Sequence, residues 1–223
     1  MDIKAEIEKL LIQEFEDVPF HNLFMLNDFN CVGTKLGGTC SDKVIHFKKI
    51  LAKNGVESRL HSAIINGLDC HRLLTVDIYE DKYYIDVGSG WANPKLIPAF
   101  DEIEHNAYGM SFKTELLNNG VAVLHKTDLE YKPMMLIPTT EMNEKDILDA
   151  IDRRYHTKSI YPFNKSLRFS KLVGDTFYFI KGNQLRKFSN SKFESQQLTK
   201  MEVFHWITKQ FEFDLKGLEY YFP

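Results

Sequence analysis

Apolar residues recur at intervals of three and four in several stretches of the chain, the spacing that puts them on one face of a helix. This spacing predicts helices over residues 2–15, 41–53 and 144–155. The second of these helices ends at Asn54-Gly55, a typical left-handed stop. A last helix is expected to begin at Thr199, which can form a capping box with Glu202.

Between the second and third helices the pattern changes to short runs of branched and aromatic residues. Turn residues such as Asn66-Gly67 and Glu80-Asp81 separate these runs. The pattern predicts strands over 58–65, 70–79, 83–87, 108–117, 120–126 and 131–137, and three more over 167–172, 176–180 and 184–188. The middle stretch is therefore expected to form a curled antiparallel sheet or a barrel.

The order of these elements predicts an α+β fold in three parts. A helical part is expected at 1–55, a β-rich part at 56–142, and a helix followed by a small α/β unit at 143–223. No internal repeat, low-complexity tract or obvious linker interrupts the sequence. The three parts are therefore expected to interlock.

Composition and charge narrow the choice of partners. The 223 residues carry 28 Lys and Arg against 31 Asp and Glu, a net charge of −3 at pH 7. Without a basic block, this balance favours neither nucleic acid nor an anionic membrane as a partner. No apolar run approaches the roughly 18 residues of a membrane span. Seventeen Phe and ten Tyr provide material for a sizeable core and an apolar pocket.

The three cysteines, Cys31, Cys40 and Cys70, are too few and odd in number for a disulfide framework. The start of the chain is charged and mixed in sign, unlike a secretory signal peptide. Both features favour a reducing, cytoplasmic compartment. No metal site is expected, because metal-ligand spacing is absent among His46, His61, His105 and His125.

Cys40 is the candidate nucleophile. It follows Gly37-Gly38-Thr39 and directly precedes a predicted helix. The positive end of a helix dipole favours a thiolate and lowers the pKa of a cysteine placed there. The alternative is a buried structural cysteine, because cysteine is among the most buried residue types. Cys31 and Cys70 are expected to be passive.

A thiolate nucleophile also needs a base and a group that orients the base. A two-residue turn at Glu80-Asp81 would pair Thr75 with Asp86 and put His71 and Asp86 on one face of a hairpin. The two residues would still lie four positions apart along the strand, roughly 13 Å. A bulge or strong coiling would have to close that gap. Otherwise His71 is an exposed strand histidine beside a surface carboxylate.

Several motifs occur in the order seen in arylamine N-acetyltransferases: Pro19-Phe20-His21-Asn22-Leu23, Gly37-Gly38-Thr39-Cys40, His71-Arg72-Leu73-Leu74 and Tyr84-Ile85-Asp86-Val87-Gly88-Ser89-Gly90. The later segments Asp146-Ile147-Leu148…Tyr155 and Tyr161-Pro162-Phe163-Asn164 follow the same order. The chain resembles that family from about Ile7 to Leu218. The Gly-Gly-x-Cys, His and Asp-Val-Gly-x-Gly series is the most specific part.

This resemblance implies a helical domain, a β-barrel domain and a small α/β lid on a core like that of transglutaminase-like cysteine proteases. It implies the catalytic triad Cys40, His71 and Asp86. It also implies a ping-pong transfer of acetyl from acetyl-CoA, as co-substrate, to an arylamine or hydrazine, without a permanently bound cofactor. Ser89 would lie on the wall of the acceptor pocket. Phe20 and Trp91 are further candidates for substrate binding, although Trp91 is equally explained as a core or rim side chain.

The chain departs from the family pattern around the cysteine. Leu36 stands where the family usually has arginine, and His21 where it has an acidic residue. Asp42 and Val44 differ as well, and the N-terminal helical domain is shorter. Two other functions therefore remain open. One is a related thiol acyltransferase, amide synthase or hydrolase, and the other is a non-catalytic binding protein on the same fold.

Overall fold

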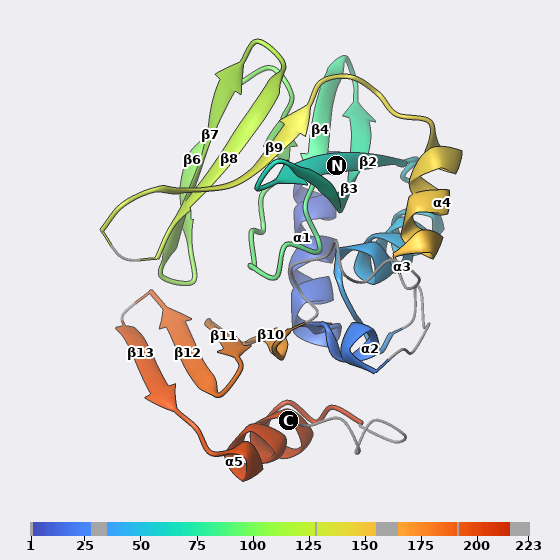
Figure 1. Ribbon diagram of the computed structural model, residues 1–223. Coiled ribbons are helices and arrows are strands. Elements are labelled where there is room, and N and C mark those ends of the chain that lie inside the picture. The colour runs from blue at the N-terminus through green and yellow to red at the C-terminus, as the bar shows by residue number, and fades with distance from the viewer. Residues whose placement is uncertain (1, 28–34, 128, 155–164, 191, 215–223) are drawn as a thin grey trace.

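The computed structural model describes residues 2–27, 35–127, 129–154, 165–190 and 192–214. Cys31, Tyr155 and the motif Tyr161-Pro162-Phe163-Asn164 lie outside these ranges. Two antiparallel sheets and a set of helices make up the fold. In Figure 1 the larger sheet occupies the upper part of the view, the smaller sheet the lower part, and helices α3 and α4 one side.

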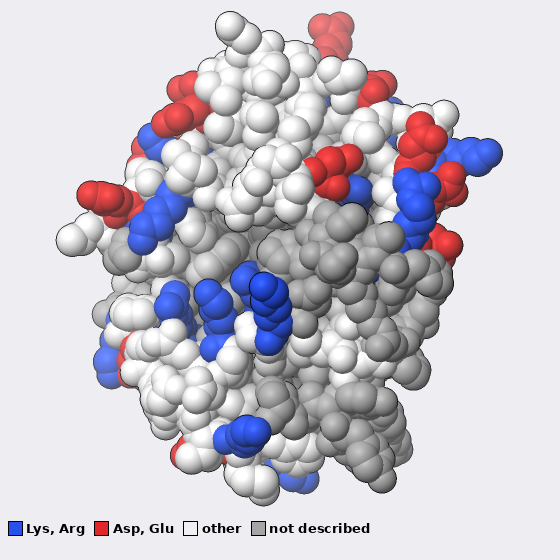
Figure 2. All heavy atoms as spheres, viewed as in Figure 1, with Lys and Arg blue, Asp and Glu red and all other residues white. Residues whose placement is uncertain are grey.

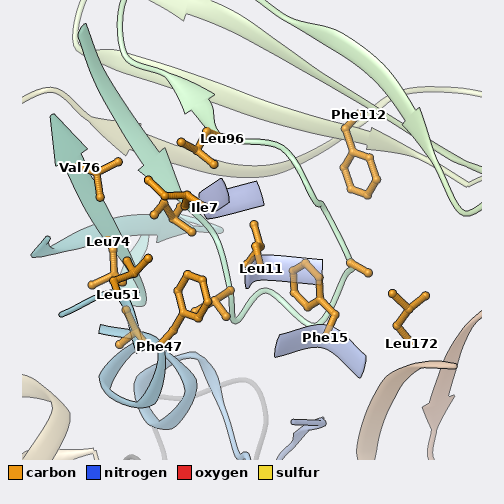
Figure 3. Close-up of a cluster of buried hydrophobic side chains, with 14 of the residues drawn as sticks. Ile7, Leu11, Phe15, Phe47, Leu51, Leu74, Val76, Leu96, Phe112 and Leu172 are labelled. Carbon is orange, nitrogen blue, oxygen red and sulfur yellow. The ribbon is translucent and has the colours of Figure 1, made fainter. Parts of the chain in front are cut away.

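Two helices in the N-terminal part of the chain, α1 and α3, contribute their apolar faces to the largest hydrophobic cluster. Helix α1 (Ile3–Asp17) begins at Asp2, whose side chain accepts hydrogen bonds from two backbone N–H groups of the first turn. Helix α3 (Cys40–Lys53) ends at Asn54, and Gly55 follows with φ 74°. Both confirm the predicted helices. Their apolar faces meet in one cluster with strand residues, as the side chains drawn in Figure 3 show. A short helix, α2 (Leu23–Leu26), lies between them in sequence.

The larger sheet has eight strands in the order β5-β4-β3-β2-β9-β8-β7-β6. The strands are β2 (Arg59–Ile65), β3 (Leu68–Ile78), β4 (Asp81–Ile85), β5 (Ile97–Pro98), β6 (Glu104–Ala107), β7 (Met110–Leu117), β8 (Gly120–Lys126) and β9 (Lys132–Pro138). Strands β5 and β6 form its two edges and do not pair with each other, so the sheet is open. Figure 1 shows that it is also curled. A second apolar cluster, including Ala63, Leu73, Tyr84 and Val121, fills the face that the helices leave uncovered.

One predicted strand begins two residues too early. The sequence predicts a strand from Tyr108 to Leu117, but Tyr108 and Gly109 form the turn between β6 and β7, with φ values of 51° and 73°. A Cβ at Gly109 would lie 2.2 Å from the Ser189 carbonyl oxygen, so the close approach and the positive φ both require glycine. Tyr108 suits a strand by its side chain, which is why the pattern misplaced it.

The predicted register of the β3–β4 hairpin is wrong by two residues. The structure pairs Ile78 with Asp81 and Thr75 with Tyr84, so the turn residues are Tyr79 and Glu80. Tyr79 takes φ 56° there and is exposed. With this register Asp86 directly follows the last paired residue of β4, two positions from His71 along β3 instead of four. The expected gap of roughly 13 Å therefore falls to about 7 Å before any side chain reaches across.

The smaller sheet has the order β1-β10-β11-β12-β13. Its strands are β1 (Phe20–His21), β10 (Arg168–Val173), β11 (Thr176–Lys181), β12 (Gln184–Ser189) and β13 (Lys192–Gln197). Helix α4 (Glu144–Arg153) precedes β10 in sequence. Helix α5 (Lys200–His205) follows β13, begins with the predicted capping box at Thr199 and continues as a π turn over Trp206–Gln210. Strand β1 pairs with β10, and Phe20 of β1 also forms an isolated bridge with Gly38. The residues just before Cys40 are therefore joined to this sheet through β1.

No helix within the described ranges has both the length and the apolar character that a membrane crossing requires.

Candidate active site

Cys40 lies at the first position of α3, and the loop before it is tightly fixed. Thr39 is the N-cap, and its backbone N–H and hydroxyl donate to Asp42 Oδ2 at 2.8 and 2.9 Å. Gly38 has φ 132°, and a Cβ on it would lie 2.4 Å from that same carboxylate. Glycine is therefore needed at position 38 for the chain to enter the helix close to Asp42.

His71 and Asp86 meet despite their separation in sequence. The Nε2 atom of His71 lies 2.9 Å from Asp86 Oδ1, and both side chains are almost fully buried. The backbone N–H groups of Gly88 and Ser89 donate to the same oxygen at 3.2 and 3.0 Å. Asp86 is therefore held from the strand end by its own loop, and it in turn orients the imidazole.

The Cys40 thiol lies next to this hydrogen-bonded pair. The His71 side chain and the backbone N–H of Arg72 both act on the sulfur and lower the pKa of the thiol. The sulfur also lies 3.8 Å from the carbonyl oxygen of Cys70. The structure thus brings together Cys40, His71 and Asp86, from α3, β3 and the loop after β4.

The neighbours of these three groups favour a charged pair. Burial alone raises the pKa of Cys40, but the imidazole of His71 and the N–H and charge of Arg72 outweigh it and lower that pKa. Burial lowers the pKa of His71, yet the charges of Asp86 and Cys40 raise it to about 10. Burial raises the pKa of Asp86, and His71 more than reverses this effect. A thiolate, an imidazolium and a carboxylate are therefore the favoured forms at neutral pH.

Cys70 has the opposite environment. Burial and the neighbouring charge of Cys40 raise the pKa of its thiol to about 11. Its side chain is buried and free of any disulfide. Of the two cysteines that the structure describes, only Cys40 lies where a thiolate is stabilised.

The three candidate substrate residues separate into two groups. Phe20 and Trp91 line a small cavity of about 10 Å³ beside the loop after Asp86, room for about one water molecule. The Trp91 ring is 4.9 Å from Phe179 of the smaller sheet and 4.6 Å from His125 of the larger one. Ser89 is half-buried and does not line this cavity, and its backbone N–H donates to Asp86.

Comparison with known proteins shows which family the chain resembles. A family model described as N-acetyltransferase matches residues 5–219, nearly the whole chain. The chain belongs to the N-acetyltransferase family. Among curated protein sequences, none matches the chain.

Solved structures share the fold of this N-acetyltransferase. The arylamine N-acetyltransferase of Mycobacterium smegmatis has 16% identity and a TM-score of 0.80, covering 97% of this chain and 88% of that one. The Mycobacterium marinum enzyme, solved in complex with CoA, has 14% identity and a TM-score of 0.82, with 96% and 88% covered. An enzyme from Bacillus cereus has 17% identity and a TM-score of 0.74, with 93% and 90% covered. The expected α+β fold is confirmed.

Leu36 and His21, two departures from the family pattern, are hydrogen-bonded to each other in this N-acetyltransferase. His21 Nε2 donates to the Leu36 carbonyl oxygen at 2.8 Å, and its Nδ1 accepts from the Leu23 N–H at 3.3 Å. Burial lowers the pKa of His21 to about 4, so the ring is neutral, as this donor and acceptor pattern requires. The backbone of Leu36 makes this bond, so its side chain is not needed for it.

Asp42 is the second departure with a structural reason. Its Oδ1 atom forms a buried ion pair with Arg154, which directly follows α4, and the Arg154 guanidinium also donates to the Ile151 carbonyl oxygen at 2.8 Å. Sequence reasoning missed Arg154, because 112 residues separate it from Asp42 and local patterns carry no signal for such a pair. The end of α4 is thereby tied to the helix start that carries Cys40.

Three other histidines, one buried and two half-buried, have partners of their own. His46 lies 3.1 Å from Glu14, His61 lies 2.8 Å from the Pro138 carbonyl oxygen, and His105 lies 2.8 Å from Asn93. Within the ranges that the structure describes, no group of three or more His, Cys, Asp or Glu side chains is arranged to hold a metal ion.

Proposed function

We propose that this N-acetyltransferase moves the acetyl group of acetyl-CoA to an arylamine through a thioester on Cys40, with His71 and Asp86 as the other catalytic residues. The observation that carries the proposal is the buried group of Cys40, His71 and Asp86: the His71 ring is hydrogen-bonded to Asp86, and the pKa shifts of Cys40 and His71 favour a thiolate and an imidazolium. This arrangement makes the sulfur a nucleophile at neutral pH.

The first half-reaction forms the acyl-enzyme. The Cys40 thiolate attacks the thioester carbonyl carbon of acetyl-CoA, and the oxyanion that develops faces the N–H groups at the start of α3. The C–S bond to CoA then breaks, and the His71 imidazolium gives its proton to the departing thiolate. The products are CoA with a free thiol and acetyl-Cys40 beside a neutral His71.

The second half-reaction returns the enzyme to its starting state. A neutral amine attacks the acetyl carbon, His71 takes the proton that the nitrogen loses, and the Cys40 thiolate leaves. Asp86, hydrogen-bonded to the ring, stabilises the imidazolium that forms again. Phe20 and Trp91 are the aromatic candidates for contact with an arylamine ring, which would have to widen the small cavity that they line. We include hydrazines as a second acceptor class.

Related structures support the donor and the triad. The M. marinum enzyme was solved with CoA, and the B. cereus enzyme has a Cys-His-Glu triad, where this chain would use Asp86.

In Figure 2, lysine and arginine side chains gather over β10–β12 in the lower half of the face in view. These strands carry Arg168, Lys171, Lys181, Arg186 and Lys187. Positively charged side chains such as these can bind the phosphates of CoA.

The three parts of the chain have separate roles in this proposal. Residues 1–55 carry the nucleophile, 56–142 carry the base and its carboxylate, and 143–223 cover the site. The free thiols of Cys40 and Cys70 support a reducing, cytoplasmic setting. The net charge of −3 supports small molecules as partners, without nucleic acid or membrane.

Steady-state kinetics test the reaction type. With acetyl-CoA and a para-substituted aniline varied together, we expect parallel double-reciprocal lines, because CoA must leave before the amine is acetylated. Cys40→Ala should abolish turnover, and an aryl hydrazide should replace the aniline as acceptor. Equal consumption of acetyl-CoA with and without amine would identify a hydrolase instead. No consumption with any acceptor would identify a binding protein.

A further inference from the structure

Strand β3 contains an irregularity directly beside the Cys40 sulfur. Ala63 of β2 pairs with His71, but the next residue, Ile64, pairs with Asp69, so Cys70 is an extra residue in β3. Such a bulge bends the strand and re-aims the side chains next to it. Here it places the Cys70 carbonyl oxygen, the His71 ring and the Arg72 N–H all toward the sulfur.

The Arg72 guanidinium spans this bulge. Its Nη1 atom donates to Asp69 Oδ1 at 2.6 Å and to the His71 carbonyl oxygen at 2.9 Å. Its Nη2 atom donates to the Asp69 carbonyl oxygen at 3.4 Å. The Arg72 side chain is 4% exposed, whereas that of Asp69 is 47% exposed. One buried cation therefore binds the residues on both sides of Cys70, and the planar fork of arginine suits this set of acceptors.

We propose that Arg72 is a positioning residue for acyl transfer: its guanidinium fixes the bulge at Cys70 and so holds the His71 ring and the Arg72 N–H on the Cys40 thiolate. The inference rests on the proposed role of Cys40 as nucleophile. The positive charge of Arg72 acts in the same direction, because it lowers the pKa of the Cys40 thiol. A bulge that relaxed would turn His71 away from the sulfur, even in a folded protein.

Several other groups around Cys40 affect its titration. His71 and Arg72 of β3 lower the pKa of the thiol, and Cys70 is the neighbouring thiol on the same strand. Asp42 and Lys43 lie on the helix of Cys40 itself, and both are buried with their own ion partners, Arg154 and Glu14. Asp86 acts through its hydrogen bond to His71. The variants below change only Arg72 or its partner Asp69 and leave the other groups in place.

The test is the pH dependence of Cys40 alkylation by iodoacetamide, followed by peptide mass. Arg72→Gln should shift the midpoint upward by about one pH unit and slow alkylation at pH 6.5 about tenfold. Arg72→Lys keeps the charge without the fork, so we expect a smaller shift of the same sign. Asp69→Asn should have the smallest effect, since both backbone carbonyls still bind the guanidinium. Each variant is also assayed for the rate of Cys40 acetylation by acetyl-CoA, which should fall in the same order.

Arg59→Gln is the matched control. Arg59 forms an ion pair with Asp77 at 2.7 Å between the same two strands, but both side chains are about half exposed. Its alkylation profile should match that of the wild type. A folded Arg72→Gln, judged by its urea midpoint, with an unchanged profile overturns the inference. If Arg72→Gln does not fold, unchanged profiles in both Arg72→Lys and Asp69→Asn overturn it. Wild-type Cys40 that alkylates rapidly but is not acetylated by acetyl-CoA would instead refute the proposed function.

Discussion

At the scale of single residues, charge pairing decides the chemistry of the site. Burying a thiolate or an imidazolium alone is costly, and burial by itself shifts the pKa of each group toward its neutral form. Together, Cys40, His71 and Asp86 compensate one another and reverse those shifts. The same protein interior therefore holds one activated thiol and one inert one, Cys70, whose pKa is raised to about 11.

The contrast between these two thiols gives the first prediction. At pH 6.5 Cys40 should alkylate at least tenfold faster than Cys70, because only Cys40 has a substantial thiolate fraction there. His71→Ala should slow Cys40 strongly and leave Cys70 unaffected. Peptide mass after short exposure to iodoacetamide measures both sites in one sample. Equal rates at the two cysteines in folded protein would contradict the account of the thiolate.

His21 gives a second prediction at this scale. Its pKa of about 4 lies below the ordinary 6.5, so in this range the unfolded chain binds a proton that the folded protein excludes. The corresponding stability is present above pH 6.5 and is lost as the pH falls toward 4, by about 3 kcal/mol in total. Urea unfolding between pH 7 and 4.5 should show a shallower pH slope for His21→Gln than for the wild type. The exposed His205→Gln is the control and should keep the wild-type slope; identical slopes for all three would contradict the prediction.

Some site residues have a local sequence signal and others have none. Cys40 is found from paired glycines before a helix, because the backbone geometry and the helix dipole are both local. Arg72 leaves no such signal, since the effect of its N–H and charge on the thiol depends on a bulge in β3. The position of Ser89 on the wall of the acceptor pocket stays a prediction, and the structure shows its backbone N–H donating to Asp86 at 3.0 Å.

At the scale of elements, several independent contacts fix the start of α3 in place. The capping box joins Thr39 to Asp42, and Asp42 is in turn paired with Arg154 beyond the end of α4. From the other side, Gly88 approaches so closely that a Cβ on it would lie 2.4 Å from the Cys40 Cα atom. Helix, loop and distant ion pair together fix where the sulfur lies.

Removing one member of the buried ion pair tests whether it braces the start of α3. Arg154→Met leaves the buried Asp42 carboxyl without its guanidinium, and this should cost about 3–5 kcal/mol of unfolding free energy. Burial already raises the pKa of Asp42, and loss of the Arg154 charge should raise it further. The double variant Asp42→Asn with Arg154→Met removes both charges and should recover part of that loss. Urea unfolding measures the stabilities. If Arg154→Met changes the unfolding free energy by less than about 1 kcal/mol, the pair is not a brace.

Element prediction succeeds or fails here for identifiable reasons. The long helices and the strands at 120–126, 176–180 and 184–188 have strong periodicity and were found from it. Strand β13, with the sequence Lys-Phe-Glu-Ser-Gln-Gln, is mostly exposed and has no apolar pattern, so it could not be predicted from hydrophobic periodicity. The β3–β4 turn was misplaced because Tyr79 resembles a strand residue but takes a positive φ.

At the scale of the whole molecule, the two sheets meet at Trp91. The ring packs against Phe179 and Phe188 of the smaller sheet and His125 of the larger one. Phe177 and Phe188 belong to the same apolar cluster as α1 and α3, so the smaller sheet, the helices and the loop after β4 share one core. The small cavity lined by Phe20 and Trp91 is thus set by how the sheets fit together.

This junction should control the choice of acceptor. Trp91→Ala removes the largest side chain at the cavity and should lower the KM for a bulky arylamine relative to a small one by about tenfold. Ser89→Phe adds a ring beside the same loop and should change the ratio in the opposite direction. The measurement is kcat/KM for a small and a bulky arylamine with each variant. A ratio that neither substitution changes would place the acceptor site elsewhere.

The central claim is that Cys40 carries the acetyl group, and one measurement tests it most directly. The protein is incubated with acetyl-CoA and no acceptor, and its intact mass and Cys40 peptide are then measured. We predict a single acetyl group, located on Cys40, that disappears when an arylamine is added as the acetylated amine forms. No adduct, or an adduct that persists in Cys40→Ala, would contradict the account.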